Sequence, residues 1–410
     1  MKVWSRFRVR STHIATGTAS ARGDEEGVKV IYFDNAATSR LKPPEVAETV
    51  ARAINSFGGV GRGAHEAALD ADLAVYRARD QIARLFNGPG AKQVAFSANV
   101  TEALNIVVSG LLHAGDHAVT TAASHNSVLR PLFRKQDEEG VELSILPVAP
   151  DASIDYEQFS NLFRDNTKLA VVTHASNLTG DVYDIARMAS IAHDHGALLV
   201  VDSAQTAGSL PIDMQADRID IVAFTGHKGL YGPQGTGGMC IAEGVEVPPF
   251  KVGGSGTHSY DRKHPAFMPE RLEAGTLNAH GLAGLLAGLV YIERRGVGTI
   301  RAETDILTRR FEEGVRAIPS VRVLGGHGGC ARCSIVALNV GDADSALVSD
   351  ALSTRFGICT RSGAHCAPLM HEALGTASQG AVRFSFSHFN TVDEVDEGIR
   401  AVSEIAHEIA

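Results

Sequence analysis

The 410-residue chain has few cysteines, few aromatic residues and no excess of positive charge. Its five scattered cysteines do not make a disulfide framework, so we expect a protein of the reducing cytoplasm. A net charge of −9 provides no basic surface for nucleic acid or for an anionic membrane. The longest apolar stretch, residues 282–292, is too short and too rich in Gly and Ala to cross a bilayer. We therefore expect no nucleic-acid partner and no membrane partner.

Two short segments offer weak signals that we set aside. Residues 1–28 place basic residues among Ser, Thr and Ala, with no acid before Asp24, as in a transit peptide. Because they form neither an amphipathic helix nor an apolar signal core, we predict a disordered N-terminal extension, with an over-long predicted start of the chain as the alternative. Cys330 and Cys333 form a lone C-x-x-C with no second pair, so two ordinary thiols are favoured and no metal site is predicted.

Apolar residues make up 44% of the chain, which is ample for a large core. Short runs rich in β-branched residues predict buried strands, and helical segments separate them. The expected strands cover residues 93–96, 117–121, 168–174, 197–202 and 219–225, and clear helices cover 66–86 and 183–195. This alternation is typical of an α/β protein with a mostly parallel sheet covered on both faces.

The pattern changes beyond residue 268. A long helix is predicted over residues 279–295, followed by antiparallel strands at 321–324, 333–338 and 382–386. We therefore predict a large domain from residue 29 to 289 and a smaller α+β domain from 290 to 410. Residues 29–45, at the start of the large domain, can pack on the smaller one.

Two strand ends carry residues that suit chemistry better than a core. Lys228 follows the apolar run 219–225, where an amine can form an imine with a carbonyl cofactor. Asp202 ends the run 197–202, where a carboxylate can keep a pyridine nitrogen protonated. Taken alone, Lys228 is more simply a surface lysine. Together, the amine and the acid are what pyridoxal phosphate requires.

Other polar residues also follow predicted strands, and ligands of such sheets gather at the carboxyl ends of the strands. His125, Asn177 and Thr225 lie at these ends. The turn from Ser97 into the helix that starts near Val100 and Thr101 can cradle a phosphate, because free backbone N–H groups and the helix dipole face the anion. That turn alone is a weak signal, since many such turns are only caps.

Several stretches taken in order carry a specific resemblance. They are Tyr32–Thr38, Ser124–Ser127, Val201–Thr206, Gly226–Lys228, Glu273–Thr276, Arg361–Cys366, and Arg383 with Asn390-Thr391. From about residue 30 to its end the chain resembles the cysteine desulfurase family of the class V aminotransferase fold, in the group whose reactive cysteine sits on a short ordered loop. The resemblance implies a pyridoxal-phosphate-dependent transferase fold, like that of aspartate aminotransferase.

The resemblance also implies roles for individual residues. The catalytic residues would be Lys228, Cys366 and His125. The residues that bind pyridoxal phosphate would be Val100, Thr101, His125, Asp202, Gln205, Thr225, His227, Lys228 and Thr276, the last reaching across from the other subunit. The residues that bind substrate would be Asn177, Arg361 and Arg383. Two positions depart from the family pattern: Ser124 stands where an acid is usual, and Val100 stands where a hydroxyl is common.

The implied reaction removes sulfur from L-cysteine, giving L-alanine and a persulfide on Cys366 for transfer to an acceptor protein, as in iron–sulfur cluster biogenesis. A homodimer is also implied. Arg361 and His365 are expected to act as cations or donors that make the thiol more nucleophilic, although an inert buried thiol is the ordinary alternative. Alternative functions are a selenocysteine lyase, a class V aminotransferase or lyase that does not use the cysteine, and a cofactor-free scaffold protein in sulfur trafficking.

Overall fold

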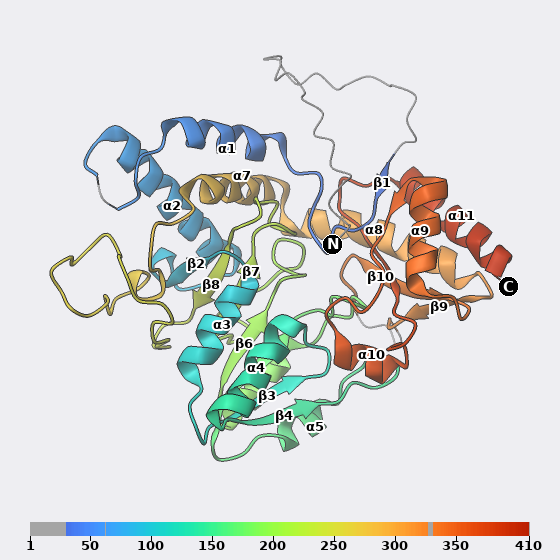
Figure 1. Cartoon of the computed structure of the whole chain (residues 1–410), viewed down its shortest axis with the longest axis horizontal. Helices are drawn as coiled ribbons and strands as arrows, with labels where there is room; N and C mark the ends of the chain where they lie inside the picture. The colour runs from blue at the N-terminus through green and yellow to red at the C-terminus, as the bar shows by residue number, and fades with distance from the viewer. Residues whose placement is uncertain (1–29, 62, 327–330, 410) are drawn as a thin grey trace, which may run out of the picture.

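The computed structural model describes residues 30–61, 63–326 and 331–409 (Figure 1). The predicted N-terminal extension, residues 1–28, and Cys330 of the C-x-x-C lie outside the described residues. Within that described part of the chain, no helix has the length and apolar content needed to span a membrane.

The elements alternate as the sequence predicts over most of the chain. The strands are β1 Ile31–Tyr32, β2 Val94–Ser97, β3 His117–Thr121, β4 Glu142–Leu146, β5 Thr167–Thr173, β6 Leu198–Asp202, β7 Ile221–Thr225, β8 Gly237–Ile241, β9 Val321–Leu324, β10 Ile335–Val340, β11 Ile358–Cys359 and β12 Val382–Ser385. The helices are α1 Pro44–Ser56, α2 Glu66–Leu85, α3 Val100–Leu111, α4 Asn126–Glu139, α5 Tyr156–Asn161, α6 Ile185–Asp194, α7 Ala279–Arg295, α8 Val297–Arg316, α9 Ser345–Phe356, α10 Pro368–Leu374 and α11 Val392–Ile409.

A seven-stranded sheet with the order β2-β8-β7-β6-β5-β3-β4 forms the centre of the molecule. Strands β3 to β7 are parallel to their neighbours among themselves, and β8 is antiparallel to both β7 and β2. The predicted α/β fold with a mostly parallel sheet is therefore confirmed. The sequence reading missed β8, because Gly237 and Gly238 weaken a strand pattern. Glycine is required there, since a Cβ on Gly238 would lie 2.3 Å from the carbonyl oxygen of Ala95.

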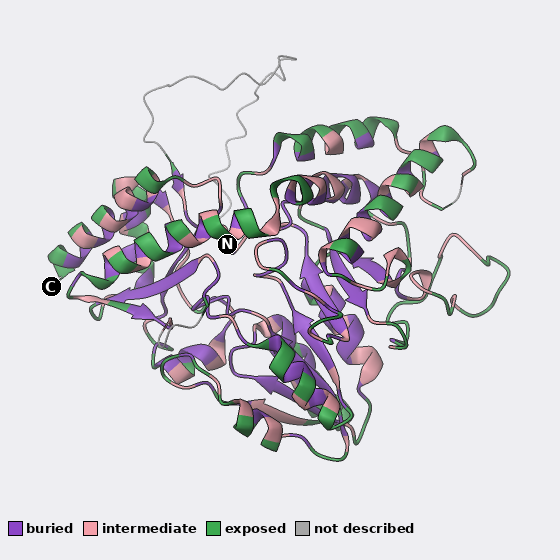
Figure 2. Ribbon diagram, turned by 180° about the vertical axis from the view of Figure 1, so that it is seen from behind, coloured by how far each residue is buried: buried purple, intermediate pink, exposed green. Residues whose placement is uncertain are grey.

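The sheet is buried on both faces, and alternate residues of one strand enter different cores (Figure 2). In β6, Leu199 and Val201 belong to the cluster that contains residues of α2, α6 and α7, whereas Val200 belongs to the cluster that contains residues of α3 and α4. This is the period of two expected for a pleated strand. Burial on both faces explains why these strands are continuous apolar runs.

A second layer lies beside the sheet and contains the C-terminal part of the chain (Figure 1). Its three-stranded antiparallel sheet has the order β12-β10-β9 and packs with α8, α9 and α11. Strand β1 pairs in parallel with β11, and Phe33 enters the same core. The predicted boundary near residue 290 falls inside α7, where Leu289 and Ile292 still belong to the core of the large sheet. The division into two domains stays a prediction.

A buried ion pair fixes the turn that precedes α7. Arg79 of α2 donates to both carboxylate oxygens of Glu273 at 2.6 Å and to the carbonyl oxygen of Val94 at 2.6 Å. Glu273 also accepts from the backbone N–H of Phe96 at 2.6 Å. The Arg79 and Glu273 side chains are only 8% and 5% exposed, so each charge depends on the other for compensation.

We expect Arg79→Ala to lower the free energy of unfolding by about 3–5 kcal/mol, because it leaves the Glu273 carboxylate buried and unpaired. Arg84→Ala is the control on the same helix, since Arg84 forms an exposed pair with Asp80. That control should change stability by less than about 1 kcal/mol. Equilibrium denaturant unfolding of both variants measures the difference. Equal losses of stability in the two variants would contradict the stabilising role of the buried Arg79–Glu273 pair.

Candidate active site

The predicted site residues converge at the carboxyl ends of the parallel strands. Thr173 of β5 is in register with Asp202 of β6, and Thr225 ends the neighbouring strand β7. Asn177 follows β5, His125 follows β3, and all of these loops leave the same edge of the sheet. The structure therefore brings together groups that are about a hundred residues apart in the sequence.

Asp202 and His125 are connected through Ser127, to which the sequence analysis gave no role. The Ser127 hydroxyl donates to Oδ2 of Asp202 at 3.3 Å, and the backbone N–H of Ala204 donates to Oδ1 at 2.9 Å. The backbone N–H of Ser127 donates to Nδ1 of His125 at 2.9 Å. This contact leaves Nε2 of a neutral His125 as the protonated nitrogen. Burial raises the pKa of Asp202, while the Ala204 N–H and the nearby Lys228 oppose that shift.

The pKa values of Lys228 and His125 are both lowered, so each group loses its proton more readily than it would in water. Burial, followed by repulsion from Arg383, lowers the pKa of the Lys228 amine to about 8, although Asp202 favours the charged form. Burial, followed by the Lys228 charge, lowers the pKa of His125 to about 4, so this imidazole is neutral at neutral pH. The result is an amine with a large neutral fraction at mildly basic pH, next to a neutral ring.

The start of α3 lies against the end of β7, as a phosphate cradle requires. A Cβ on Gly237 would lie 2.6 Å from Cα of Asn99, and Gly237 is the register partner of Thr225. Asn99 caps the helix by accepting from the N–H of Glu102 at 3.0 Å. The amides of Val100 and Thr101 precede the first intrahelical hydrogen bond, so they are available to an anion.

Arg383 is buried and already engaged. Its Nη2 donates to Oδ1 of Asp34 at 2.8 Å, and its Nη1 donates to the carbonyl oxygen of Asn177 at 3.0 Å. The Arg383 backbone also pairs with that of Arg361. Asp34 lies in a stretch that carries the family resemblance, but no role was predicted for it. Its contact joins residues 349 positions apart, which no local pattern indicates.

The loop that carries Cys366 is hydrogen-bonded into the strand-end loops. The amide of Asn177 donates to the carbonyl oxygen of His365 at 2.6 Å, and the N–H of Asn126 donates to that of Cys366 at 2.9 Å. Both His365 and Cys366 have positive φ, 49° and 57°, which non-glycine residues adopt only when the surroundings fix them. The loop is therefore ordered by the site itself.

The expectation that His365 acts as a cation beside the thiol is wrong. His365 is buried, and its Nε2 lies 3.0 Å from the carbonyl oxygen of Ala381, to which it must donate. Burial, followed by repulsion from Arg383, lowers the pKa of His365 to about 3. The ring is neutral at neutral pH and contributes no charge.

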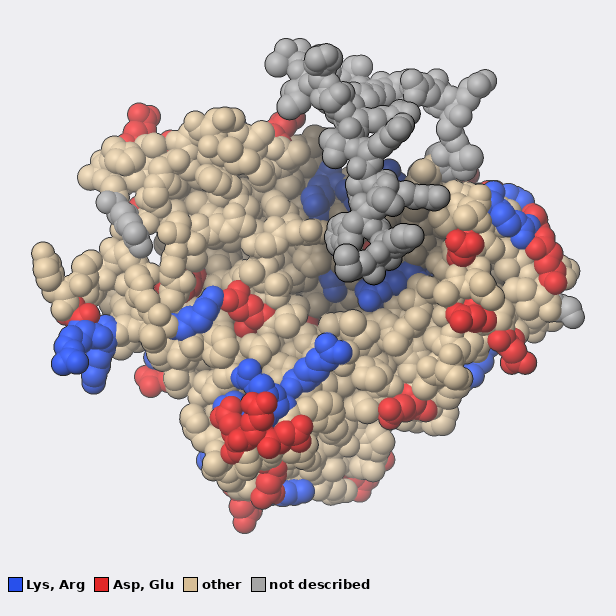
Figure 3. All heavy atoms as spheres, viewed as in Figure 1, with Lys and Arg blue, Asp and Glu red and all other residues tan. Residues whose placement is uncertain are grey.

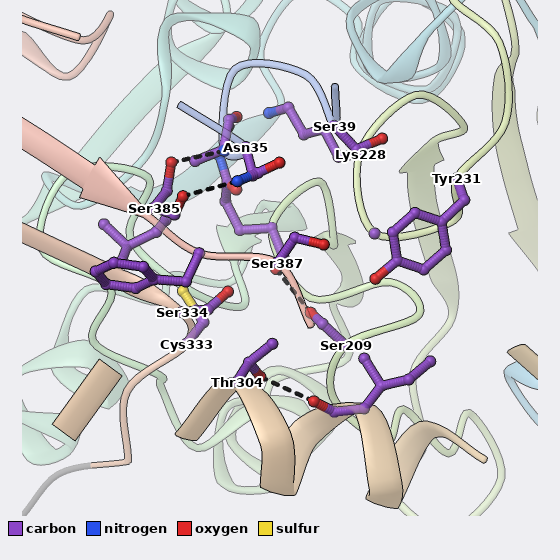
Figure 4. A pocket seen from close by; sticks show the side chains of 16 residues that line it. Asn35, Ser39, Ser209, Lys228, Tyr231, Thr304, Cys333, Ser334, Ser385 and Ser387 are labelled. Atoms are coloured by element: carbon purple, nitrogen blue, oxygen red, sulfur yellow. Dashed lines mark hydrogen bonds between the residues drawn. The ribbon is translucent and has the colours of Figure 1, made fainter. Parts of the chain in front are cut away.

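The remaining predicted residues divide into two places. Gln205 lines a cavity of about 40 Å³ with Lys228 and Tyr231, and donates to the carbonyl oxygen of Ala36 at 3.3 Å (Figure 4). Thr276 is exposed and is not part of this cavity; it lines a separate hollow with Tyr76 on α2.

In the space-filling view, Lys and Arg atoms lie in the central hollow of one face, while Asp and Glu lie mainly outside it (Figure 3). Such a distribution attracts an anionic ligand.

A lysine and an acid at the strand ends of a mostly parallel sheet are typical of a pyridoxal-phosphate enzyme. Comparison with known proteins agrees with that class. The family described as aminotransferase class-V matches residues 31–397. Similar proteins include probable cysteine desulfurases of Methanothermobacter thermautotrophicus, 33% identical over 92% of this chain and 94% of its own, and of Halobacterium salinarum, 35% identical over 92% of both.

A solved structure agrees as well. The apo structure of a cysteine desulfurase from Thermococcus onnurineus NA1 has a TM-score of 0.86 and 32% identity, over 92% of this chain and 95% of that one. The chain belongs to the class V aminotransferase family, in its cysteine desulfurase group. The resemblance stated from the sequence is thereby confirmed.

Members of this family depend on pyridoxal phosphate, and the residues present fit that cofactor. Within the described part of the chain, several buried polar atoms at the site lack a hydrogen-bond partner: Thr225 Oγ1, His227 Nδ1, Asn177 Oδ1 and Arg383 Nε. Buried polar groups normally have partners, so these atoms indicate a polar ligand. Burial also lowers the pKa of His227 to about 4, which makes its ring a neutral neighbour for an anion.

We expect imine formation between pyridoxal phosphate and the cofactor-free protein to speed up between pH 7 and 9 and to level off above about pH 9. The reason is that the neutral amine attacks, and the pKa of Lys228 is lowered to about 8. An ordinary lysine would gain about tenfold per pH unit up to its pKa near 10.4. Stopped-flow absorbance measures the rate, with Lys228→Ala as the control that gives no imine. A rate that still climbs tenfold between pH 9 and 10 would be inconsistent with a depressed pKa.

Proposed function

We propose that this protein is a pyridoxal-phosphate-dependent cysteine desulfurase that converts L-cysteine to L-alanine and leaves the sulfur as a persulfide on Cys366. The observation that carries the proposal is the placement of the Cys366 loop. Asn126, which adjoins His125 after β3, donates to the carbonyl oxygen of Cys366, and Asn177, which follows β5, donates to that of His365. A reactive thiol is thus held at the edge of the sheet that presents Lys228.

The assigned cofactor residues fit three parts of pyridoxal phosphate. Asp202, held by Ala204 and Ser127, keeps the pyridine nitrogen protonated. His125 would pack beside the bound ring, and Gln205 would bind the ring hydroxyl. The phosphate is assigned to Val100, Thr101, Thr225 and His227, with Thr276 contributed by a second subunit.

The bound cofactor supplies an electron-withdrawing ring that takes up the electron pair left when the substrate loses its α-proton. Lys228 moves that proton, for which a lowered pKa suits its amine. The Cys366 thiolate attacks the substrate sulfur. A sulfur–sulfur bond forms and the carbon–sulfur bond breaks, with its electron pair returning to carbon. That carbon takes a proton and becomes the methyl group of alanine, and Lys228 returns a proton to the α-carbon before alanine leaves.

The substrate carboxylate is assigned to Arg383, with Arg361 and Asn177 beside it. Arg383 is preset by Asp34 and by the carbonyl oxygen of Asn177, and its Nε has no partner within the described residues. A planar guanidinium fits a carboxylate in two-pronged geometry, which a lysine cannot reproduce. The burial of Arg383 and its contact with Asn177 at the strand ends together support its assignment to the substrate carboxylate.

Cys366→Ala tests the function. We expect the variant to bind pyridoxal phosphate as the wild type does, because Lys228 and Asp202 remain, and to release alanine from cysteine at least about a hundredfold more slowly, because nothing accepts the sulfur. Alanine release and peptide mass mapping of the persulfide are the measurements. Cys240→Ala is the control, since burial raises the pKa of that thiol to about 12 and makes it inert.

Selenocysteine is run in parallel, because a selenocysteine lyase is the alternative function. Selenium leaves more readily than sulfur. The lyase would be favoured if the Cys366→Ala variant still cleaved selenocysteine and if the wild type preferred selenocysteine to cysteine. Alanine release from cysteine at the wild-type rate by Cys366→Ala would refute the proposed mechanism and favour a lyase that does not use the cysteine.

A homodimer is part of the proposal, supported by an exposed apolar face of α2. Leu69, Leu73 and Tyr76 are 54%, 46% and 57% exposed, and their spacing places them on one face of the helix. Tyr76 lines the same hollow as Thr276. A second copy seated there covers the apolar face and brings Thr276 to the partner's phosphate.

We expect Leu73→Arg to weaken the dimer at least about tenfold and to reduce cofactor retention, because a charge would be buried in the interface. Leu347→Arg on α9 is the matched control, since Leu347 is 69% exposed in the C-terminal layer. Analytical ultracentrifugation gives the oligomeric state. An active wild-type monomer at assay concentration would eliminate the shared site.

A sulfur-acceptor protein and a cytoplasmic location complete the proposal.

A further inference from the structure

A bridge of three aromatic side chains ends on the loop that carries Lys228. The hydroxyl of Tyr231 lies 2.8 Å from Nδ1 of His388, and the hydroxyl of Tyr291 lies 2.7 Å from Nε2 of the same ring. Tyr231 is three residues after Lys228, Tyr291 is on α7, and His388 follows β12. The bridge therefore ties the Lys228 loop to a helix on the large sheet and to the C-terminal layer.

The chemistry of His388 allows both contacts at once. A neutral imidazole donates from one nitrogen and accepts at the other, so one phenol accepts while the other donates. Burial lowers the pKa of His388 to about 4, which keeps the ring in that neutral form. The ring centroid also lies 5.6 Å from that of Tyr291, in a stacked arrangement, and 4.0 Å from that of Phe389.

The Lys228 loop is confined from other sides by backbone packing. The N–H of Tyr231 donates to the carbonyl oxygen of Lys228 at 3.0 Å and closes the turn. A Cβ on Gly288 of α7 would lie 2.4 Å from the carbonyl oxygen of Leu230, and one on Gly208 would lie 2.4 Å from that of Gly229. With its backbone in contact on two sides, the loop has little room to move independently of Tyr231.

Tyr231 itself is in an unfavourable conformation. Its φ of 55° lies in the left-handed region, which an aromatic residue adopts only when its surroundings over-determine it. The side chain lines the same cavity as Lys228, as Figure 4 shows. The bond to His388 fixes the far end of that side chain, and so helps to hold the strained turn.

We propose that His388 is a positioning residue that acts through Tyr231 to hold the Lys228 amine in place for the cofactor. The proposal rests on the proposed role of Lys228 and assigns no group of His388 to the chemistry. Its consequence is that loss of the bridge slows steps that need the amine, while substrate affinity is unaffected.

The test measures capture of pyridoxal phosphate by the full-length, cofactor-free chain, trapped by borohydride and quantified on the Lys228 peptide. His388→Phe keeps the ring stack and removes both hydrogen bonds, so we expect capture and kcat to fall about tenfold with KM for cysteine within about twofold. Tyr291→Phe leaves the Tyr231 contact and should cost about threefold. His388→Gln, which can donate and accept, should recover at least about half of the wild-type rate.

His195→Phe is the matched control. That exposed ring stacks on Phe163 at 5.1 Å and makes one contact to Ser160 at 3.3 Å, so its loss should leave capture unchanged. Folded His388→Phe with wild-type capture and kcat would overturn the proposal. If that variant does not fold, Tyr291→Phe decides, and a wild-type capture rate there is the overturning result. Wild type that captures cofactor without consuming cysteine would refute the proposed reaction and leave this inference standing.

Discussion

Desolvation of a single amine is the constraint on which the site depends. Lys228 follows a strand that is buried on both faces, and its pKa falls to about 8 because the surroundings replace water with protein. The same low-dielectric edge raises the pKa of Asp202 and leaves polar atoms such as Thr225 Oγ1 unpaired within the described residues. These costs are offset only when an anionic, hydrogen-bonding ligand fills the space.

The main features of this edge could be predicted because they follow from local pattern. Continuous apolar runs predicted the parallel strands β3, β5, β6 and β7, and the polar residue at a strand end, such as Asp202 or Thr225, followed from that assignment. The parallel strand β4 was not predicted, because only its last residue is buried and it is not a continuous apolar run. The central strand β8 was not predicted, because its glycines have a low strand propensity. Glycine is needed there because the neighbouring backbone leaves no room for a side chain. The Asp34–Arg383 pair and the Ser127 contact with Asp202 depend on tertiary packing between distant segments.

The error about His365 has the same origin. A histidine beside a reactive cysteine suggests a cation, but its charge is decided by burial, which sequence does not show. In the structure the ring donates to Ala381 and its pKa falls to about 3. His365 therefore helps to fix the loop conformation, together with the Asn177 contact to its carbonyl oxygen.

This result leaves lysine and arginine side chains as the positive charges near His125. With His365 and His125 neutral, the cations that act on His125 are Lys228, Arg361, Arg383 and Arg130. Arg383 is already neutralised in part by Asp34, so an incoming carboxylate competes with an internal one for the same guanidinium. The charge balance of the site therefore involves the segment that follows β1, a strand that pairs with β11 of the C-terminal layer, as well as the strand ends of the large sheet.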